Sequence, residues 1–131
     1  MISWNHDEIV FYPPEGQGEH KHLVLIIGSQ TAVGPEEYYF TYTAPQVYNI
    51  LPVANPTTDG GYTMTINGTS FGINGASVIL EDPLFNSTND RMEPSSCAII
   101  QQSHEAVVCT VPRGMGNAIH VTLTVDGRSD W

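Results

Sequence analysis

An internal repeat is the feature that most constrains how this chain folds. Residues 6–18 align without a gap with residues 104–116, and the match continues from His22–Ile27 to His120–Val125. The offset is 98 residues throughout. Self-similarity at a constant offset marks repeated structural units. We therefore expect the chain to hold one unit and about a third of another.

The repeat also predicts how the chain is divided. A length of 131 residues suits one domain, or one domain and a fragment. We expect residues 1–43 to be the closing strands of an upstream domain and residues 44–131 to be the next domain. Because Trp131 aligns with Val33, the strand equivalent to Tyr38–Thr43 is expected to come from outside this sequence.

The hydrophobic periodicity predicts an all-β fold. Runs rich in Val, Ile, Thr and Tyr recur along the chain, and Gly and Pro separate them. Many short strands of this kind indicate a β-sandwich or a barrel. Leu23–Ile27 has no polar face, so we expect its second side to be covered as well. The predicted strands are Glu8–Tyr12, His22–Ile27, Tyr38–Thr43, Val47–Leu51, Tyr62–Asn67, Ser77–Leu80, Cys97–Gln101, Ala106–Val111 and Ile119–Val125.

Charge and hydropathy exclude two classes of partner. The chain carries 14 acidic and 4 basic side chains, a formal net charge of −10, which repels nucleic-acid phosphates and anionic membranes. The longest apolar stretch, Leu23–Ile27, is far shorter than the roughly 20 residues of a membrane span. We therefore expect neither nucleic-acid binding nor membrane insertion by this segment.

Two sequons indicate N-linked glycans, at Asn67 and at Asn86. Asn67-Gly68 is also a turn dipeptide, so the alternative is that Asn67 starts the turn towards Phe71. Asn86 lies in a polar stretch that is typical of an exposed loop. We expect Asn86 to be the more accessible of the two.

The cysteine usage favours an extracellular or cell-surface protein. Cys97 and Cys109 lie on two predicted strands, which suits a disulfide between neighbouring strands, and two buried free thiols are the alternative. No secretory leader is recognisable at the N-terminus. Met1 falls in the middle of a strand of the repeat, so we do not expect it to be a biological start.

An ordered set of motifs resembles the IPT/TIG domain, the immunoglobulin-like fold of plexins, related receptors and some transcription factors. The resemblance covers residues 44–131 except for the last strand, and residues 1–43 resemble the final third of a preceding copy. The matching segments are Ala44–Pro52, Asp59–Gly72, Cys97 and Val107–Gly116.

The resemblance implies an all-β, immunoglobulin-like sandwich. In this family, cysteines at the positions of Cys97 and Cys109 commonly pair. Phe11 stands at the position equivalent to Cys109, so the upstream copy cannot form the same bridge. Such domains occur in tandem as stalks and binding surfaces, and a related domain in Rel-type transcription factors dimerises and holds DNA. The acidic charge, the sequons and the predicted disulfide argue against the transcription-factor branch.

No catalytic constellation is recognisable in the sequence. His20 and His22 are spaced to share a strand face, which would suit a surface metal ion, but surface histidines at a strand entry are favoured because Ala118 stands where the repeat places His20. The serines lie in no nucleophile elbow, and the acidic residues do not follow the order of a calcium loop. We therefore expect no enzymatic activity, no cofactor and no metal. The remaining histidines are His6, His104 and His120.

Two functional classes remain open. The first is a structural module of a tandem-repeat or filament-forming glycoprotein, whose partners are copies of itself or adjacent repeats, joined head-to-tail by strand addition. The second is a ligand-binding or adhesion ectodomain fragment of a cell-surface receptor. Its candidate aromatic anchors are Trp4, Tyr38, Tyr39, Tyr42, Tyr48 and Trp131. The alternatives are that Tyr38, Phe40 and Tyr42 are core residues and that Trp4 and Trp131 lie at junctions.

Overall fold

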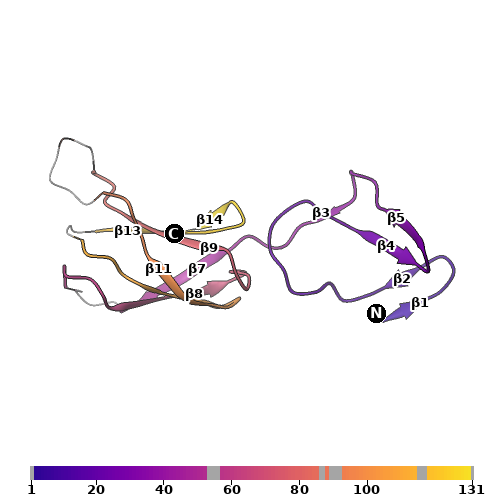
Figure 1. Cartoon of the computed structure of the whole chain (residues 1–131), viewed down its shortest axis with the longest axis horizontal. Coiled ribbons are helices and arrows are strands. Elements are labelled where there is room, and N and C mark those ends of the chain that lie inside the picture. The colour runs from indigo at the N-terminus through magenta and orange to yellow at the C-terminus, as the bar shows by residue number, and fades with distance from the viewer. Residues whose placement is uncertain (1, 53–56, 86–87, 89–92, 115–117, 131) are drawn as a thin grey trace.

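The computed structural model describes residues 2–52, 57–85, 88, 93–114 and 118–130 of the chain. In these residues the regular secondary structure consists of β-strands, and the sheets are antiparallel. This architecture confirms the predicted fold class. No helix of the described residues is long and apolar enough to cross a membrane. Figure 1 shows two parts lying end to end, which we call the first unit (residues 2–43) and the second unit (residues 44–130).

The second unit is a sandwich of two four-stranded sheets. The order of strands in one sheet is β11 (Ala98–Gln102), β12 (Ala106–Thr110), β8 (Thr63–Thr69) and β7 (Gln46–Leu51). The order in the other is β10 (Ser95–Ser96), β9 (Ala76–Glu81), β13 (His120–Val125) and β14 (Arg128–Asp130). Alternating apolar residues point inward from the central strands.

The core of the structure lies between these two sheets. Ile66 on β8, Val107 on β12 and Leu123 on β13 are fully buried. Phe71 closes one end of the core, and a Cβ on Gly68 would collide with its ring. The buried apolar residues are Met64, Ile66, Phe71, Val78, Leu80, Cys97, Val107, Cys109, Val111, Leu123 and Val125.

The first unit consists of three two-stranded sheets. β1 (Ser3–Trp4) pairs with β2 (Ile9–Val10), β3 (Lys21–His22) with β6 (Tyr39–Phe40), and β4 (Val24–Ile27) with β5 (Gln30–Val33). No large apolar side chain among residues 2–43 is buried. The first unit therefore has strands but no closed core among the described residues.

The hairpins of the two units have the same strand register. Shifting the pairs Leu25–Ala32 and Ile27–Gln30 by 98 residues gives Leu123–Asp130 and Val125–Arg128, which are paired in the second unit. The pair Trp4–Ile9 likewise becomes Gln102–Val107. Hairpins β4–β5 and β1–β2 are thus the structural equivalents of β13–β14 and β11–β12.

Several expectations about burial in the first unit are wrong. All residues of Leu23–Ile27 are exposed, because the described residues provide no sheet that covers them. Tyr38 and Phe40 are exposed rather than in a core, for the same reason. Trp4 lies on β1, at the end of the first unit that is far from the second unit (Figure 1), so a junction there would be with another unit or subunit.

Candidate functional site

The histidines and the acidic residues are dispersed. Among the described residues, no three His, Cys, Asp or Glu side chains gather in a group that could hold a metal ion. His20 and His22 are both exposed, and the His20 ring lies 4.2 Å from the ring of Tyr39. Burial raises the pKa of Tyr62 above its usual value of 10.0, so this phenol is neutral near pH 7 and serves packing.

The structure joins Cys97 and Cys109 in a disulfide with a Cα–Cα distance of 5.6 Å. Cys97 lies between β10 and β11, where the chain passes from one sheet to the other, and Cys109 lies on β12. Both residues are buried in the core of the second unit. The bridge therefore ties the crossing segment to a central strand.

Asn67 lies inside strand β8, so the alternative that it starts a turn is wrong. The turn begins later, at Ser70, whose φ is 61°. Met64 and Ile66 point into the core, which places Asn67 on the outer face of the sheet. Its Nδ2 donates a hydrogen bond to Oδ1 of Asn49 on β7, at 2.8 Å. The second sequon residue, Asn86, lies outside the described residues.

The predicted aromatic anchors do not form one patch. Tyr48 lies on β7 of the second unit, and its hydroxyl is 3.1 Å from Oγ1 of Thr69. Tyr38 and Tyr39 lie near β6 of the first unit, whereas Tyr42 is half-buried and donates to the Pro14 carbonyl at 2.9 Å. Trp131 is outside the described residues.

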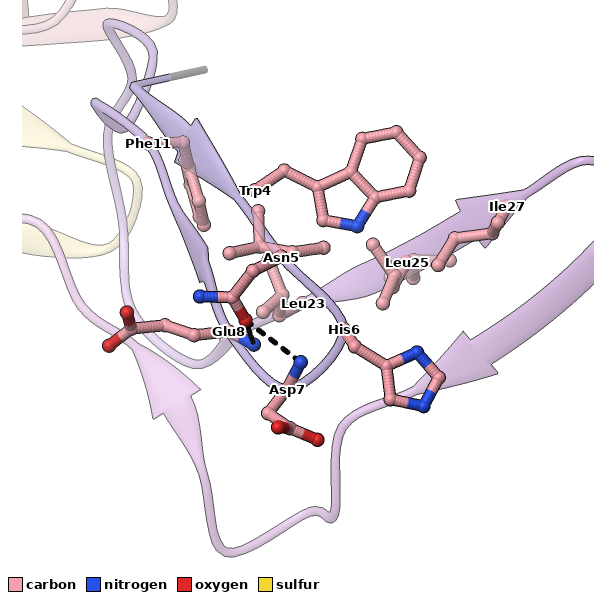
Figure 2. A pocket seen from close by; sticks show the side chains of 11 residues that line it. Trp4, Asn5, His6, Asp7, Glu8, Phe11, Leu23, Leu25 and Ile27 are labelled. Carbon is pink, nitrogen blue, oxygen red and sulfur yellow. Dashed lines mark hydrogen bonds between the residues drawn. The ribbon is translucent and has the colours of Figure 1, made fainter.

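The first unit has an exposed apolar surface, which we call the open face. It lines a groove between hairpin β1–β2 and hairpin β4–β5, and Figure 2 shows its side chains around this groove. At its rim, Oδ1 of Asn5 accepts hydrogen bonds from the backbone N–H groups of Asp7 and Glu8 and closes the β1–β2 turn. The residues of the open face are Trp4, Ile9, Phe11, Leu23, Leu25 and Ile27.

The open face occupies positions that form the core in the second unit. Leu25 and Ile27 are 39% and 46% exposed, whereas their equivalents Leu123 and Val125 are 0% and 2% exposed. Phe11 is 42% exposed and its equivalent Cys109 is fully buried. Exposed apolar surface of this kind marks an interaction site. The open face is therefore an uncovered interior rather than an ordinary outer surface.

A polar junction connects the two units, and Arg128 lies at its centre. Arg128 Nη2 donates to the carbonyl oxygen of Tyr42 at 2.8 Å, and Nη1 lies 3.4 Å from Oε1 of Glu19. Lys21 Nζ donates to Oδ2 of Asp126 at 3.1 Å. Asp126 and Arg128 flank the turn between β13 and β14. Side chains and a backbone carbonyl of the first unit therefore bind both ends of this turn.

Close backbone approach adds to this junction. Gly18 is buried with a φ of 91°, and a Cβ there would overlap the Asp126 carboxylate. A Cβ on Gly72 would likewise overlap the Gln17 amide. Two of the four basic residues of the chain, Lys21 and Arg128, lie at this junction, which the sequence did not identify.

Part of one strand edge of the second unit has no pairing partner among the described residues. Residues His120–Thr122 pair with β9 on one side, whereas β14 pairs only with Leu123–Val125 on the other. In the first unit the equivalent of His120 is His22, which pairs with Tyr39 of β6. Within the part of the chain that the structure describes, no strand takes that place beside His120.

Comparison with known families and proteins adds one match. The model of the family described as "IPT/TIG domain" matches residues 45–131, which cover nearly all of the second unit. No curated protein and no solved structure matches the chain.

Proposed function

The chain belongs to the IPT/TIG family, and on that premise we propose that it is a non-enzymatic structural module of an extracellular glycoprotein. Domains of this family are immunoglobulin-like modules that occur in extracellular receptors and in transcription factors, and they are generally non-catalytic. The disulfide and the fold fit the extracellular type. The module is one unit of a tandem array or filament, and it assembles head-to-tail with adjacent repeats or copies of itself.

The observation that carries this proposal is the equality of strand registers at an offset of 98 residues. Two units whose hairpins have the same strand register follow each other along the chain and lie end to end (Figure 1). Repeats of this kind contact only their neighbours, so the architecture extends by adding further units. The division into a closing part at residues 1–43 and a following domain at 44–131 is part of the proposal.

Strand complementation is the proposed way in which the second unit is completed. The edge of His120–Thr122 offers unpaired backbone groups at the place where the first unit has β6. An added strand satisfies those groups and removes an aggregation-prone edge. The strand equivalent to Tyr38–Thr43 is therefore supplied from the next unit, in the same chain or in another copy.

N-linked glycans fit this role. Asn67 lies on the outer face of the β11–β12–β8–β7 sheet, where a glycan would cover the side of the module and leave its ends free for neighbouring units. Asn86 is the second proposed site. A glycan on Nδ2 of Asn67 leaves one N–H on that nitrogen, which can still donate the hydrogen bond to Asn49.

Exposed aromatic side chains favour the alternative proposal, an adhesion or ligand-binding ectodomain of a receptor. Tyr38 and Tyr39 line a second groove of the first unit together with Phe40, and all are at least 45% exposed. Aromatic side chains of this kind are frequent anchors at protein interfaces. In this reading the groove receives a partner from outside the array.

A peptide with the sequence of residues 37–43 tests strand complementation. Added to the full chain, it is expected to protect the backbone amides of residues 119–121 from hydrogen exchange, because the equivalent residues Lys21 and His22 pair with β6. A matched peptide with Tyr39→Pro lacks the N–H that the pairing needs and serves as the control. Equal protection by both peptides, or by neither, contradicts strand complementation at this edge.

A further inference from the structure

The open face of the first unit coincides with two unpaired strand edges. In the second unit, β12 pairs with β8 and β13 pairs with β9, in addition to their hairpin partners. In the first unit, the equivalent strands β2 and β4 pair only with their hairpin partners β1 and β5 among the described residues. The same side of the unit therefore lacks both apolar cover and backbone partners.

The second unit shows what covers these positions. β8 contributes Met64 and Ile66 to the core, and β9 contributes Val78 and Leu80. These strands satisfy the backbone edges of β12 and β13 and bury their apolar side chains at once. A second copy of the chain stacked face to face would bury side chains but would leave the edges of β2 and β4 unpaired.

We infer that the open face binds a pair of β-strands of this same repeat type, with the pattern of β8 and β9, and that a small side chain stands beside Phe11 at the position equivalent to Cys97. The inference rests on the proposed tandem array and specifies the chemistry of the neighbouring segment. β2 and β4 each gain one strand partner in this arrangement, and Leu25 and Ile27 become core residues like Leu123 and Val125.

The small side chain follows from Phe11. In the second unit the equivalent residue is Cys109, and its sulfur bonds to Cys97. The phenyl ring of Phe11 stands at the position equivalent to Cys109 and is much larger than the thiol of a cysteine. Because protein interiors are close-packed, the partner residue at the position of Cys97 must be small, such as alanine or glycine.

The loop between the two docking strands meets a different side chain on the first unit. Gln102 fixes this loop there: its Nε2 donates to the Phe71 and Asn74 carbonyls at 2.6 and 3.0 Å, and its Oε1 accepts from the Ala76 N–H at 3.1 Å. The equivalent residue in the first unit is Trp4, which has one N–H donor and no acceptor. The loop that binds the open face therefore packs against an indole instead of the Gln102 amide.

A fused chain tests the inference. Residues 44–98 with Cys97→Ala are joined in front of Met1, which keeps the phase of the repeat because residue 98 precedes residue 99, the equivalent of Met1. We expect the amides of residues 23–27 to exchange about a hundredfold more slowly than in the unfused chain. The matched control carries Cys97→Phe in the added copy. Because this ring clashes with Phe11, we expect the amides of residues 23–27 to exchange about tenfold faster in the control than in the alanine copy.

The amides of residues 121–125 report whether the second unit stays folded in both fused chains. If those amides remain protected and residues 23–27 gain nothing, the open face does not bind these strands. Equal protection by the alanine and phenylalanine copies contradicts the small partner residue.

If the fused chains misfold, a synthetic peptide of residues 62–82 is added to the unmodified chain. It carries β8, the loop and β9, and an absence of added protection at residues 23–27 overturns the inference. Either result is independent of whether the native protein forms filaments, so failure of the inference and failure of the proposed function are distinguishable.

Discussion

Equivalent residues of the two units can be identical in type and still differ in what surrounds them. Leu25 and Leu123 are the same amino acid at the same position of the repeat, yet only Leu123 is buried. The burial of a leucine side chain stabilises a fold by about 1.5–3 kcal/mol. The second unit gains this stabilisation at each core position, and the first unit does not gain it from the described residues.

The disulfide reinforces the unit that already has a core. The double variant Cys97→Ala/Cys109→Ala is expected to lower the free energy of unfolding of the second unit by about 3 kcal/mol, because a closed loop of this size restricts the unfolded chain. Denaturant titration followed by residue-specific hydrogen exchange measures the change. Reduction of the unmodified protein serves as the comparison and should lower the free energy of unfolding by a similar amount. An unchanged unfolding midpoint would contradict stabilisation by the disulfide.

Arg128 is the residue on which the geometry of the junction depends most. In the Arg128→Ala variant the carbonyl of Tyr42 and the carboxylate of Glu19 lose their charged partner. Hydrogen bonds to charged groups contribute about 1.5–3 kcal/mol, so chymotrypsin cleavage after Tyr42 should accelerate about tenfold or more. Arg113→Ala is the matched control, since Arg113 is exposed on the second unit and should leave cleavage unchanged. Equal rates in the two variants would show that Arg128 does not hold the units together.

At the scale of elements, the two hairpins with equal registers provide an internal comparison. β4–β5 and β13–β14 have the same pairing, but β13 has the additional partner β9 and a covered apolar face. In the unmodified chain we expect amides of β13 to exchange about a hundredfold more slowly than those of β4. Residue-specific hydrogen exchange measures both in one sample. Similar protection of the two strands would mean that the open face is covered in solution.

The sequence predicted the strands that carry strong periodicity and missed several short ones, among them β1, β10 and β14. Thr63–Thr69 and His120–Val125 alternate apolar and polar residues, so their position and inward faces were predictable. Arg128–Asp130 is polar and short, and it becomes a strand because Asp126 and Gly127, both with positive φ, form a tight hairpin turn after β13. Ser3–Trp4 is only two residues long and depends wholly on its partner.

The candidate sites were predictable to a different degree. The disulfide between Cys97 and Cys109 was predictable, because these are the two cysteines of the chain and both lie on or next to predicted neighbouring strands. The family resemblance indicated the same pair. The junction of Lys21, Asp126 and Arg128 could not be derived in the same way, since its residues are about a hundred positions apart and meet only through the packing of two units. The open face was also not predictable, because apolar side chains give the same sequence pattern whether they are covered or not.

At the scale of the whole molecule, the contacts that the described residues make between the two units are mostly polar. The Lys21–Asp126 pair is nearly half-exposed on both sides, and such pairs contribute about 0–1 kcal/mol. Gly18 and Gly72 let the units approach closely and so fix their relative orientation. A constant orientation from unit to unit is what converts a tandem array into a regular assembly, because repetition of one contact generates a helical or linear filament.

Electron microscopy of the native protein, purified with its glycans intact, tests the central claim most directly. The account predicts regular filaments or stalks whose axial repeat equals the length of one unit. In such an assembly, image reconstruction should show an added strand beside residues 120–122 of every unit. Isolated particles without an axial repeat, each with a second unit that closes on itself, would contradict the claim and favour a receptor ectodomain with a separate partner.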